Sequence, residues 1–195
     1  MRFEQDPEDS ATGPQSSRVA WCGPGRGPPV IYSIGHSNHD LRTFVALLQG
    51  ATIDAVADVR SAPFSRFNPQ FNNRELARAL RATGIAYVYL GQLLGGRPAD
   101  PDCYVNGRLD PLRLVGGTPF QRGIQRLLVG ASRYRVAIMC AEREPRRCHR
   151  HHLITPVLVA AGARVIHILH DGRLREAEVE APIVGSRSGD LFDEV

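Results

Sequence analysis

Residues 30–59 read VIYSIGHSNHDLRTFVALLQGATIDAVADV, and their pattern is the strongest indication of the fold class. Two short runs rich in β-branched residues, Val30–Ile34 and Ile53–Val59, are typical of buried strands. Between them, Asp40–Gln49 places its apolar residues on one helix face, and Gly50 follows where helix ends favour glycine. A strand, a helix and a strand in this order predict two parallel strands joined by a crossover helix.

The same alternation continues to residue 169. Further strands are predicted at Ile85–Leu90, Tyr134–Cys140 and Arg164–Leu169, and further helices at Asn73–Thr83, Thr118–Leu128 and Arg146–Ala161. Pro156 should kink or restart the last helix. We therefore expect an α/β fold of three layers, α/β/α, with a mainly parallel five-stranded sheet and an extra edge strand within Glu176–Val184. Gly91–Gly117 is predicted to be a long lid or binding loop.

The two ends of the chain differ from this body in composition. Residues 1–29 are rich in Gly, Pro and Ser and are predicted to be a disordered leader. Residues 30–175 are expected to form a single α/β domain, and residues 176–195 an edge segment and an acidic tail. The body has 20 Arg against 10 acidic residues, whereas the whole chain has a net charge of only +4. This excess favours an anionic ligand, such as a nucleotide or nucleic acid, as the partner.

All 24 basic residues are arginines. The absence of lysine excludes phosphate-binding-loop nucleoside triphosphatases, protein kinases and Schiff-base enzymes, which all need that residue. The four cysteines are too irregularly spaced for a secreted disulfide framework, and the acidic N-terminus lacks the start of a signal peptide. No apolar run approaches the ~20 residues that span a bilayer. We therefore expect a cytoplasmic protein without a membrane contact.

Polar residues follow four of the predicted strands. Ligands of an open parallel sheet bind outside the carboxyl ends of its strands, so these residues should share one rim. They are Gly35-His36-Ser37-Asn38, Asp58-Val59-Arg60-Ser61, Gly95-Gly96-Arg97 and Cys140-Ala141-Glu142-Arg143, and the next helix is predicted to begin with Cys148-His149-Arg150. The sequence thus predicts a single functional site at this rim.

Five ordered motifs, spread over residues 31–169, resemble the family called domain of unknown function 488. They are Ile34-Gly-His-Ser-Asn38, Asp58-Val-Arg60, Phe67-Asn-Pro-Gln-Phe71, Leu94-Gly-Gly-Arg97, and Cys140-Ala-Glu142 followed by Cys148-His-Arg150. The resemblance implies a compact three-layer α/β fold of bacterial and archaeal cytoplasm. It also implies that the motif residues form the site, but it names no reaction.

Four residues are candidates for catalysis: Cys140, Glu142, His36 and Asp58. Cys140 ends a buried strand before a helix start and several arginines, which favours a nucleophilic thiolate; the alternative is a buried structural cysteine. His36 or Glu142 would move a proton, although His36 could instead order the turn at Gly35. Asp58 and Arg60 lie two apart on one strand face and can form an ion pair that only fixes the rim.

The candidates for substrate binding are Ser37, Asn38, Arg60, Asn68, Gln70, Arg97, His149 and Arg150. Arg60, Arg97 and Arg150 would hold a phosphate or carboxylate in bidentate forks. Residues 63–71 interleave phenylalanines with Arg66 and amides, a composition that stacks on bases and reads their edges; alternatively, the phenylalanines only pin the segment onto the core. Asn72 or Asn73 is expected to cap the next helix.

Two further sites are possible around Cys140. A metal could be bound by Cys140, Cys148, His149 and His152, because Cys148 and His152 lie four apart on one face of the predicted helix, although no C-x2-C pair is present. His36 could join them as a further ligand, and the smallest set is Cys140, Cys148 and His152. The C-x5-R spacing of Cys140 and Arg146 matches cysteine phosphatases, but nearby carboxylates would repel a phosphate dianion. No particular cofactor is indicated.

The sequence leaves three functions open. The leading hypothesis is an enzyme that acts on a phosphate-bearing substrate, a nucleotide or nucleic acid, at the rim of the sheet. The alternatives are a non-catalytic module that binds nucleotides or nucleic acid, and a thiol- or metal-dependent sensor.

Overall fold

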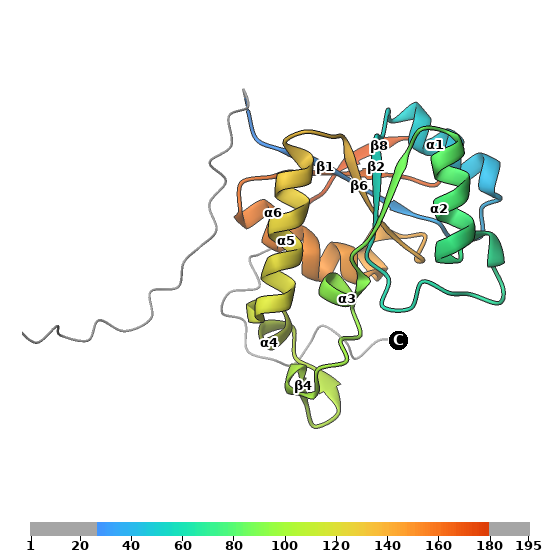
Figure 1. Ribbon diagram of the computed structural model, residues 1–195. Helices are drawn as coiled ribbons and strands as arrows, with labels where there is room; N and C mark the ends of the chain where they lie inside the picture. The colour runs from blue at the N-terminus through green and yellow to red at the C-terminus, as the bar shows by residue number, and fades with distance from the viewer. Residues whose placement is uncertain (1–26, 180–195) are drawn as a thin grey trace, which may run out of the picture.

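The main sheet of the computed structural model, which describes residues 27–179, has six strands in the order β3-β2-β6-β1-β7-β8 (Figure 1). Their bounds are β1 Val30–Gly35, β2 Ala55–Asp58, β3 Ala86–Tyr89, β6 Val136–Cys140, β7 Arg164–Ile168 and β8 Leu174–Glu176. The five strands from β3 to β7 in this order are parallel and correspond to the five predicted strands. The predicted α/β fold with a mainly parallel sheet is confirmed.

The edge strand begins earlier than the sequence predicted. β8 pairs antiparallel with β7 and shares only Glu176 with the predicted range Glu176–Val184. A tight turn returns the chain at once, because Gly172 adopts a φ of +83° and the Leu169 N–H donates to the Arg173 carbonyl at 2.8 Å. Residues 180–184 lie outside the described residues, as do residues 1–26 of the predicted leader and residues 180–195 of the predicted tail.

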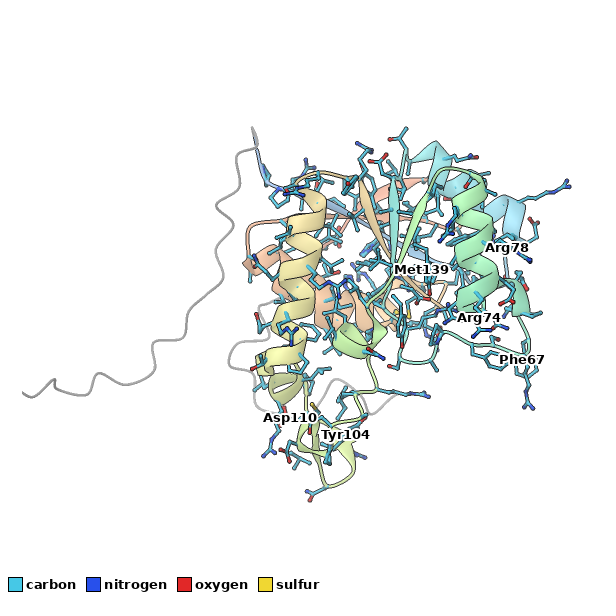
Figure 2. All side chains as sticks on the ribbon, in the orientation of Figure 1. Phe67, Arg74, Arg78, Tyr104, Asp110 and Met139 are labelled. Atoms are coloured by element: carbon cyan, nitrogen blue, oxygen red, sulfur yellow. The ribbon has the colours of Figure 1, made fainter. Side chains whose placement is uncertain are left out.

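Helices cover both faces of the sheet and complete the three layers. α1 (Leu41–Gly50) and α2 (Asn73–Ala82) pack on one face, and α5 (Thr118–Ala131) and α6 (Thr155–Ala160) pack on the other (Figure 1). Side chains alternate along β6, so Met139, labelled in Figure 2, packs beneath α1 and α2, whereas Cys140 belongs to the core beneath α5. The Cys140 thiol therefore lies on the α5 face of the sheet.

The predicted helix Arg146–Ala161 is wrong in its first half. The chain forms a 3-10 turn, η3 (Pro145–Arg147), then a π-helical turn, η4 (Arg150–Ile154), and becomes α-helical only in α6. Pro156 lies in the first turn of α6, where its missing N–H needs no partner, so the predicted restart is confirmed. Because residues 141–149 are irregular, their side chains do not follow helical spacing.

The predicted long loop Gly91–Gly117 contains several short helices and strands. It contains α3 (Gly91–Leu94), η2 (Pro101–Cys103), the hairpin of β4 (Tyr104–Val105) and β5 (Arg108–Leu109), and α4 (Pro111–Gly116). Asn106 and Gly107 both have positive φ, the geometry that an Asn-Gly hairpin turn requires. Asp110 caps α4 by accepting from two backbone N–H groups, and Figure 2 labels Tyr104 and Asp110 at this end of the molecule.

The two ends of α2 differ in how they are capped. Gly84 has a φ of +79° just after α2, a backbone conformation that favours glycine at a helix end. Asn72 stands at the start of α2, but its side chain does not cap the helix and instead accepts from the Ser65 N–H at 2.7 Å. Among the described residues, no helix has both the length and the apolar character needed to cross a membrane.

Candidate functional site

A pocket of about 340 Å³ lies at the carboxyl ends of β1, β2 and β6. Six of the predicted site residues line it: His36, Ser37, Asn38, Arg60, Asn68 and Glu142. Arg143, Phe64 and Ser65 complete much of the wall. The sequence placed Arg143 at the rim and the other two in the segment 63–71, but named none of the three as a catalytic or substrate-binding candidate. Glu142 and Arg143 are exposed, so a carboxylate and a guanidinium are accessible at the same opening. The predicted convergence of strand ends thus brings half of the candidates together.

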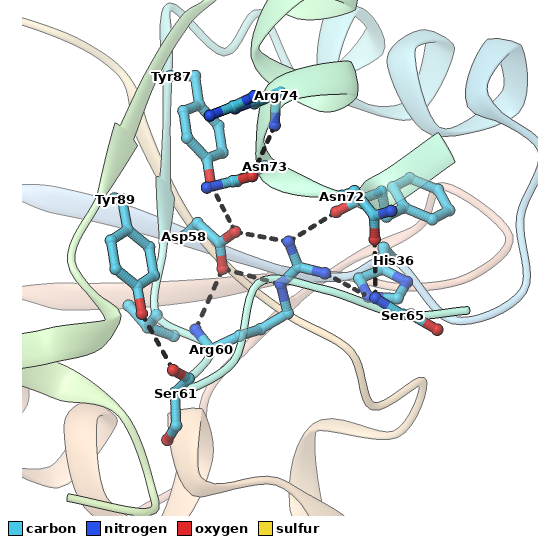
Figure 3. Close-up of polar contacts among 12 residues, drawn as sticks. His36, Asp58, Arg60, Ser61, Ser65, Asn72, Asn73, Arg74, Tyr87 and Tyr89 are labelled. Carbon is cyan, nitrogen blue, oxygen red and sulfur yellow. Dashed lines mark hydrogen bonds and ion pairs between the residues drawn. The ribbon is translucent and has the colours of Figure 1, made fainter. Parts of the chain in front are cut away.

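Asp58 and Arg60 form a buried ion pair at the wall of this pocket, in which Asp58 is fully buried and Arg60 lines the pocket (Figure 3). The Asp58 carboxylate accepts from Arg60 Nε at 2.9 Å and from Arg60 Nη2 at 2.6 Å, and the Tyr87 hydroxyl donates to it at 2.8 Å. Burial alone would lower the pKa of Arg60, but the hydrogen bonds and charge of Asp58 outweigh it and raise that pKa. The fork of Arg60 is therefore occupied by Asp58, which corrects the prediction that it holds a substrate anion in bidentate fashion.

His36 is held in one orientation by three contacts. Its Nδ1–H donates to the Ser37 carbonyl at 2.8 Å, so its Nε2 is left to accept from Arg60 Nη1 at 3.2 Å (Figure 3). The ring stacks on Phe71 with centroids 4.3 Å apart. Burial lowers the pKa of His36 to about 4, so the ring is neutral at neutral pH. With Nε2 occupied, His36 suits a positioning role better than proton transfer.

The second group of polar side chains lies behind the pocket wall and consists of Cys140, Cys148 and His149. The Nδ1 atom of His149 lies 3.6 Å from Cys140 Sγ and 3.8 Å from Cys148 Sγ. The opposite ring nitrogen, Nε2, donates to the Val59 carbonyl at 3.1 Å, which leaves the Nδ1 lone pair facing the sulfurs. Both cysteines are buried, and neither forms a disulfide.

The two thiols of this group differ in acidity. A hydrogen bond from Cys148 lowers the pKa of Cys140 to about 7, assisted by the Arg150 charge and by the backbone N–H groups of Ala141 and Glu142. The same hydrogen bond, together with burial, raises the pKa of Cys148 to about 12. Cys140 is therefore the more acidic of the two thiols, mainly because of its hydrogen bond with Cys148, and Arg150 is the arginine that contributes.

Arg150 is only 1% exposed and cannot reach a ligand in the pocket. Its guanidinium donates to Ser33 Oγ at 3.1 Å and to the carbonyls of Glu142 at 2.8 Å and Arg143 at 3.3 Å. Among residues 27–179, no carboxylate forms an ion pair with it. Arg150 therefore holds the loop after β6 in place through hydrogen bonds to its carbonyls. It adds positive potential near Cys140 and does not bind an anion directly.

Three other candidates point elsewhere. Arg97 is exposed but does not line the pocket, and its backbone N–H donates to Ser61 Oγ. Gln70 donates to the His39 carbonyl at 3.1 Å, so it joins two loops. His152 contacts the Arg146 carbonyl and is not part of the cysteine group, so the structure brings together Cys140, Cys148 and His149 of the predicted metal candidates and leaves His152 out.

Arg146 also points away from Cys140. Its guanidinium pairs with Glu178 at 2.7 Å and is half exposed. The C-x5-R spacing therefore does not place an arginine over the thiol, so the cysteine-phosphatase arrangement is absent.

Two glycines let these segments approach one another. A Cβ on Gly35 would lie 1.9 Å from the Glu142 carbonyl oxygen, so only glycine permits the loop after β6 to cross the end of β1. A Cβ on Gly96 would lie 2.8 Å from the His149 ring. Gly96 thus serves close packing against His149, and Gly95 serves close packing against Gly91 and Ser61, while Arg97 beside them remains at the surface.

The phenylalanines of residues 63–71 fall into two groups. Phe71 is fully buried between His36 and Phe44, but Phe64 is 71% exposed and Phe67 is 82% exposed. The Arg66 guanidinium lies over the Phe67 ring, 5.2 Å from its centroid. Figure 2 shows Phe67 on the same side of the molecule as Arg74 and Arg78 of α2. Only Phe71 pins the segment to the core.

The comparisons with known proteins give one match. A family model described as "Domain of unknown function DUF488" matches residues 40–156. This range contains the Asp58–Arg60 pair, Glu142 and the cysteine group, whereas the pocket residues His36 to Asn38 precede it. No curated protein and no solved structure matches the chain.

Proposed function

The chain belongs to the family of domain of unknown function DUF488, and we propose that it is an enzyme. In this proposal it acts on a phosphate-bearing substrate, a nucleotide or nucleic acid, at the carboxyl-end rim of the sheet. The observation that supports this proposal is the pocket of about 340 Å³, where a carboxylate, an arginine and several neutral hydrogen-bonding groups from three strand ends meet. Sites of open parallel sheets lie in this position.

The pocket residues divide the work of such an enzyme. Arg143 binds the phosphate, since its guanidinium is exposed at the pocket. The second N–H of Arg60 Nη1, beyond the one that His36 accepts, adds a donor. Ser37, Asn38 and Asn68 bind neutral polar groups of the substrate.

Glu142 is the group that moves a proton. It is the carboxylate of the pocket wall, whereas Asp58 is fully engaged by Arg60 and Tyr87. Cys140 does not line the pocket, so this proposal requires no covalent intermediate on its sulfur.

A product screen tests the proposal. The purified chain is incubated with nucleoside mono-, di- and triphosphates and with single- and double-stranded oligonucleotides, and products are detected by mass spectrometry. Glu142→Gln should lower kcat on any converted substrate by about 100-fold or more, because a positioned acid or base contributes that much. Arg143→Gln should mainly raise KM.

Two matched substitutions serve as controls. Glu75→Gln removes an exposed carboxylate on α2, and Arg133→Gln removes an exposed arginine in the turn before β6, at the opposite end of that strand. Both should leave turnover unchanged. Full turnover by Glu142→Gln would exclude Glu142 from the chemistry, and absence of any product in the screen would count against an enzyme.

The exposed phenylalanines favour a second candidate, a non-catalytic module that binds single-stranded nucleic acid. Phe64 and Phe67 are largely exposed, and Arg66 lies over the Phe67 ring. Exposed aromatic rings beside arginine are the platforms on which bases stack, at about 1–3 kcal/mol per base. The exposed arginines Arg74 and Arg78 of α2 form no ion pair with any described residue and would face the backbone phosphates.

Fluorescence anisotropy with a labelled single-stranded oligonucleotide tests this candidate. Phe67→Ala should weaken binding by about 10-fold, the lower part of the stacking range, and affinity should fall steeply with salt. Tyr134→Ala, which removes a ring that is 57% exposed before β6, is the control and should not weaken binding. Equal affinity of Phe67→Ala and the unsubstituted chain would rule out the stacking surface.

A further inference from the structure

We propose that Cys140, Cys148 and His149 bind a Zn²⁺ ion. Their ligand atoms all lie within 4.8 Å of one another, and no other group of three or more His, Cys, Asp or Glu residues among residues 27–179 has this arrangement. The proposal goes beyond the proposed function and does not depend on it, because none of these three side chains lines the substrate pocket.

The distances fit a tetrahedral zinc site. Zn–S bonds of about 2.3 Å and Zn–N bonds of about 2.0–2.1 Å at tetrahedral angles separate sulfur from nitrogen by about 3.6 Å. His149 Nδ1 lies 3.6 Å from Cys140 Sγ and 3.8 Å from Cys148 Sγ. Both sulfur–nitrogen separations therefore match those of a tetrahedral zinc site, and the two sulfurs lie within 4.8 Å of each other.

The surrounding groups hold the ligands as metal sites do. A ligating histidine usually donates its other ring N–H to a carbonyl or carboxylate, and His149 Nε2 donates to the Val59 carbonyl at 3.1 Å. This bond fixes the tautomer in which Nδ1 presents its lone pair to the sulfurs. Gly96 leaves room for the ring in this position, because a Cβ there would lie 2.8 Å from it. The backbone N–H groups of Ala141 and Glu142 point at Cys140 Sγ and would stabilise a metal-bound thiolate.

The charge of the group also suits zinc. Two thiolates and a neutral imidazole balance one Zn²⁺, so the complex is neutral where both cysteines are buried. Arg150 lies within electrostatic reach of both sulfurs, and its positive charge favours the deprotonated form that a metal requires. Soft sulfur ligands combined with imidazole select Zn²⁺ over Mg²⁺ or Ca²⁺.

Three protein ligands leave one tetrahedral position open. Catalytic zinc sites have this number of protein ligands, with water or substrate in the fourth position, whereas structural sites have four. The described residues supply three, so the chemical class of the site is Cys2His with one exchangeable ligand.

The test is the metal content of the full chain, purified under reducing conditions without chelator and measured by elemental analysis. One zinc per chain is expected. After Zn²⁺ is removed by chelation, added Co²⁺ should produce a sulfur-to-cobalt charge-transfer band and the visible absorption of a tetrahedral site. Cys140→Ser, Cys148→Ser and His149→Asn should each weaken Zn²⁺ binding by about 100-fold or more, since altering a second-shell partner of a ligand already costs about 10–100-fold.

Two control variants and one measurement on the unsubstituted chain separate loss of zinc binding from loss of folding. Cys103→Ser removes a buried cysteine outside the group, and His152→Asn removes the neighbouring histidine; both should keep full zinc content. Zn²⁺ should also protect Cys140 and Cys148 from alkylation in the folded chain, while labelling of Cys103 stays the same. A reduced, folded chain that neither contains zinc nor binds it at micromolar concentration would overturn the proposal, as would equal alkylation of Cys140 with and without Zn²⁺.

Discussion

Replacing Asp58 by Asn should destabilise the fold by about 3–5 kcal/mol, the cost of leaving a buried charge without its partner. Asp58 is fully buried, and Arg60 is 5% exposed, so water cannot replace the lost carboxylate. The introduced amide would also place an NH2 donor where the carboxylate has only acceptors. One carboxylate oxygen faces Arg60 Nη2 and the Tyr87 hydroxyl, and the other faces Arg60 Nε and the Arg60 backbone N–H. Whichever way the introduced amide is turned, its NH2 group meets at least one donor.

Arg60 cannot relieve this cost by losing its proton, because an arginine remains charged at any pH that proteins tolerate. The remaining acceptors of its guanidinium are neutral: the Phe71 carbonyl at 2.8 Å and His36 Nε2 at 3.2 Å. A loss of about 4 kcal/mol lowers the equilibrium constant for folding by about 1,000-fold. That is a large part of the roughly 5–15 kcal/mol that stabilises a domain.

Urea unfolding followed by circular dichroism measures the effect. Asp171→Asn is the matched control, because the Asp171 ion pair with Arg173 is exposed and screened by solvent, so that its loss should change the free energy of unfolding little. Tyr87→Phe removes one hydrogen bond to the same carboxylate and should cost about 1.5 kcal/mol. A loss for Asp58→Asn no larger than that for Asp171→Asn would refute the argument that the Asp58–Arg60 pair is a buried, obligatory unit.

Three further predictions concern packing and pH. Gly35→Ala should lower the free energy of unfolding by about 3 kcal/mol in urea titrations, because its Cβ would collide with the backbone of the loop after β6. Phe71→Ala should cost about 3–5 kcal/mol, and Phe67→Ala less than about 0.5 kcal/mol, because only the first ring is buried. Burial, aided by the charges of His151, Arg150 and Arg175, lowers the pKa of His167 from 6.5 to about 3. The unfolded chain therefore takes up this proton first, so the stabilisation from neutral His167 should be complete above about pH 6.5 and its loss should cost about 2 kcal/mol by pH 5. His36, with a pKa of about 4, should add a similar loss over the same range.

Each of these has its own control. Gly50→Ala meets nothing within 4 Å at the end of α1 and should leave the fold as stable or slightly more stable. Similar losses of unfolding free energy for Phe71→Ala and Phe67→Ala would contradict the prediction that only the Phe71 ring contributes to the core. His167→Gln should reduce the loss of stability between pH 6.5 and pH 5, and an unchanged pH profile would exclude His167 as its source.

The order of the elements could be predicted from sequence because apolar periodicity is local. Each strand of the parallel sheet is a short apolar run, since both faces are covered, and each crossover helix has one apolar face. The Asp58–Arg60 pair could be predicted for the same reason, since residues two apart on a strand share a face. The hairpin within residues 91–117 had a local signal too, Asn106-Gly107, which sequence reasoning overlooked.

The sequence could propose the members of the cysteine group but could not decide which histidine faces the sulfurs, because the geometry is not periodic. Helical spacing favoured His152 over His149 as the partner of Cys148, but the chain before Thr155 forms a 3-10 turn and a π-helical turn. Those turns direct His149 toward the sulfurs and His152 toward the Arg146 carbonyl. Spacing rules assume a regular helix, and residues 145–154 do not form one.

Composition likewise could not show how the arginines are used. Arg60, Arg97 and Arg150 have the same chemistry in sequence, yet the first is engaged by Asp58, the second is exposed outside the pocket, and the third is buried among backbone carbonyls. Burial depends on which segments pack together, and that depends on contacts between residues far apart in the chain.

The sequence by itself determined the α/β class, the parallel strands and the rim at which the polar residues meet, because these follow from local periodicity and from the fixed hand of crossover connections. Only the tertiary structure decided which rim residues face a substrate and which hold the rim together. That division depends on burial, since a side chain whose hydrogen bonds are already made inside the protein cannot also bind a ligand.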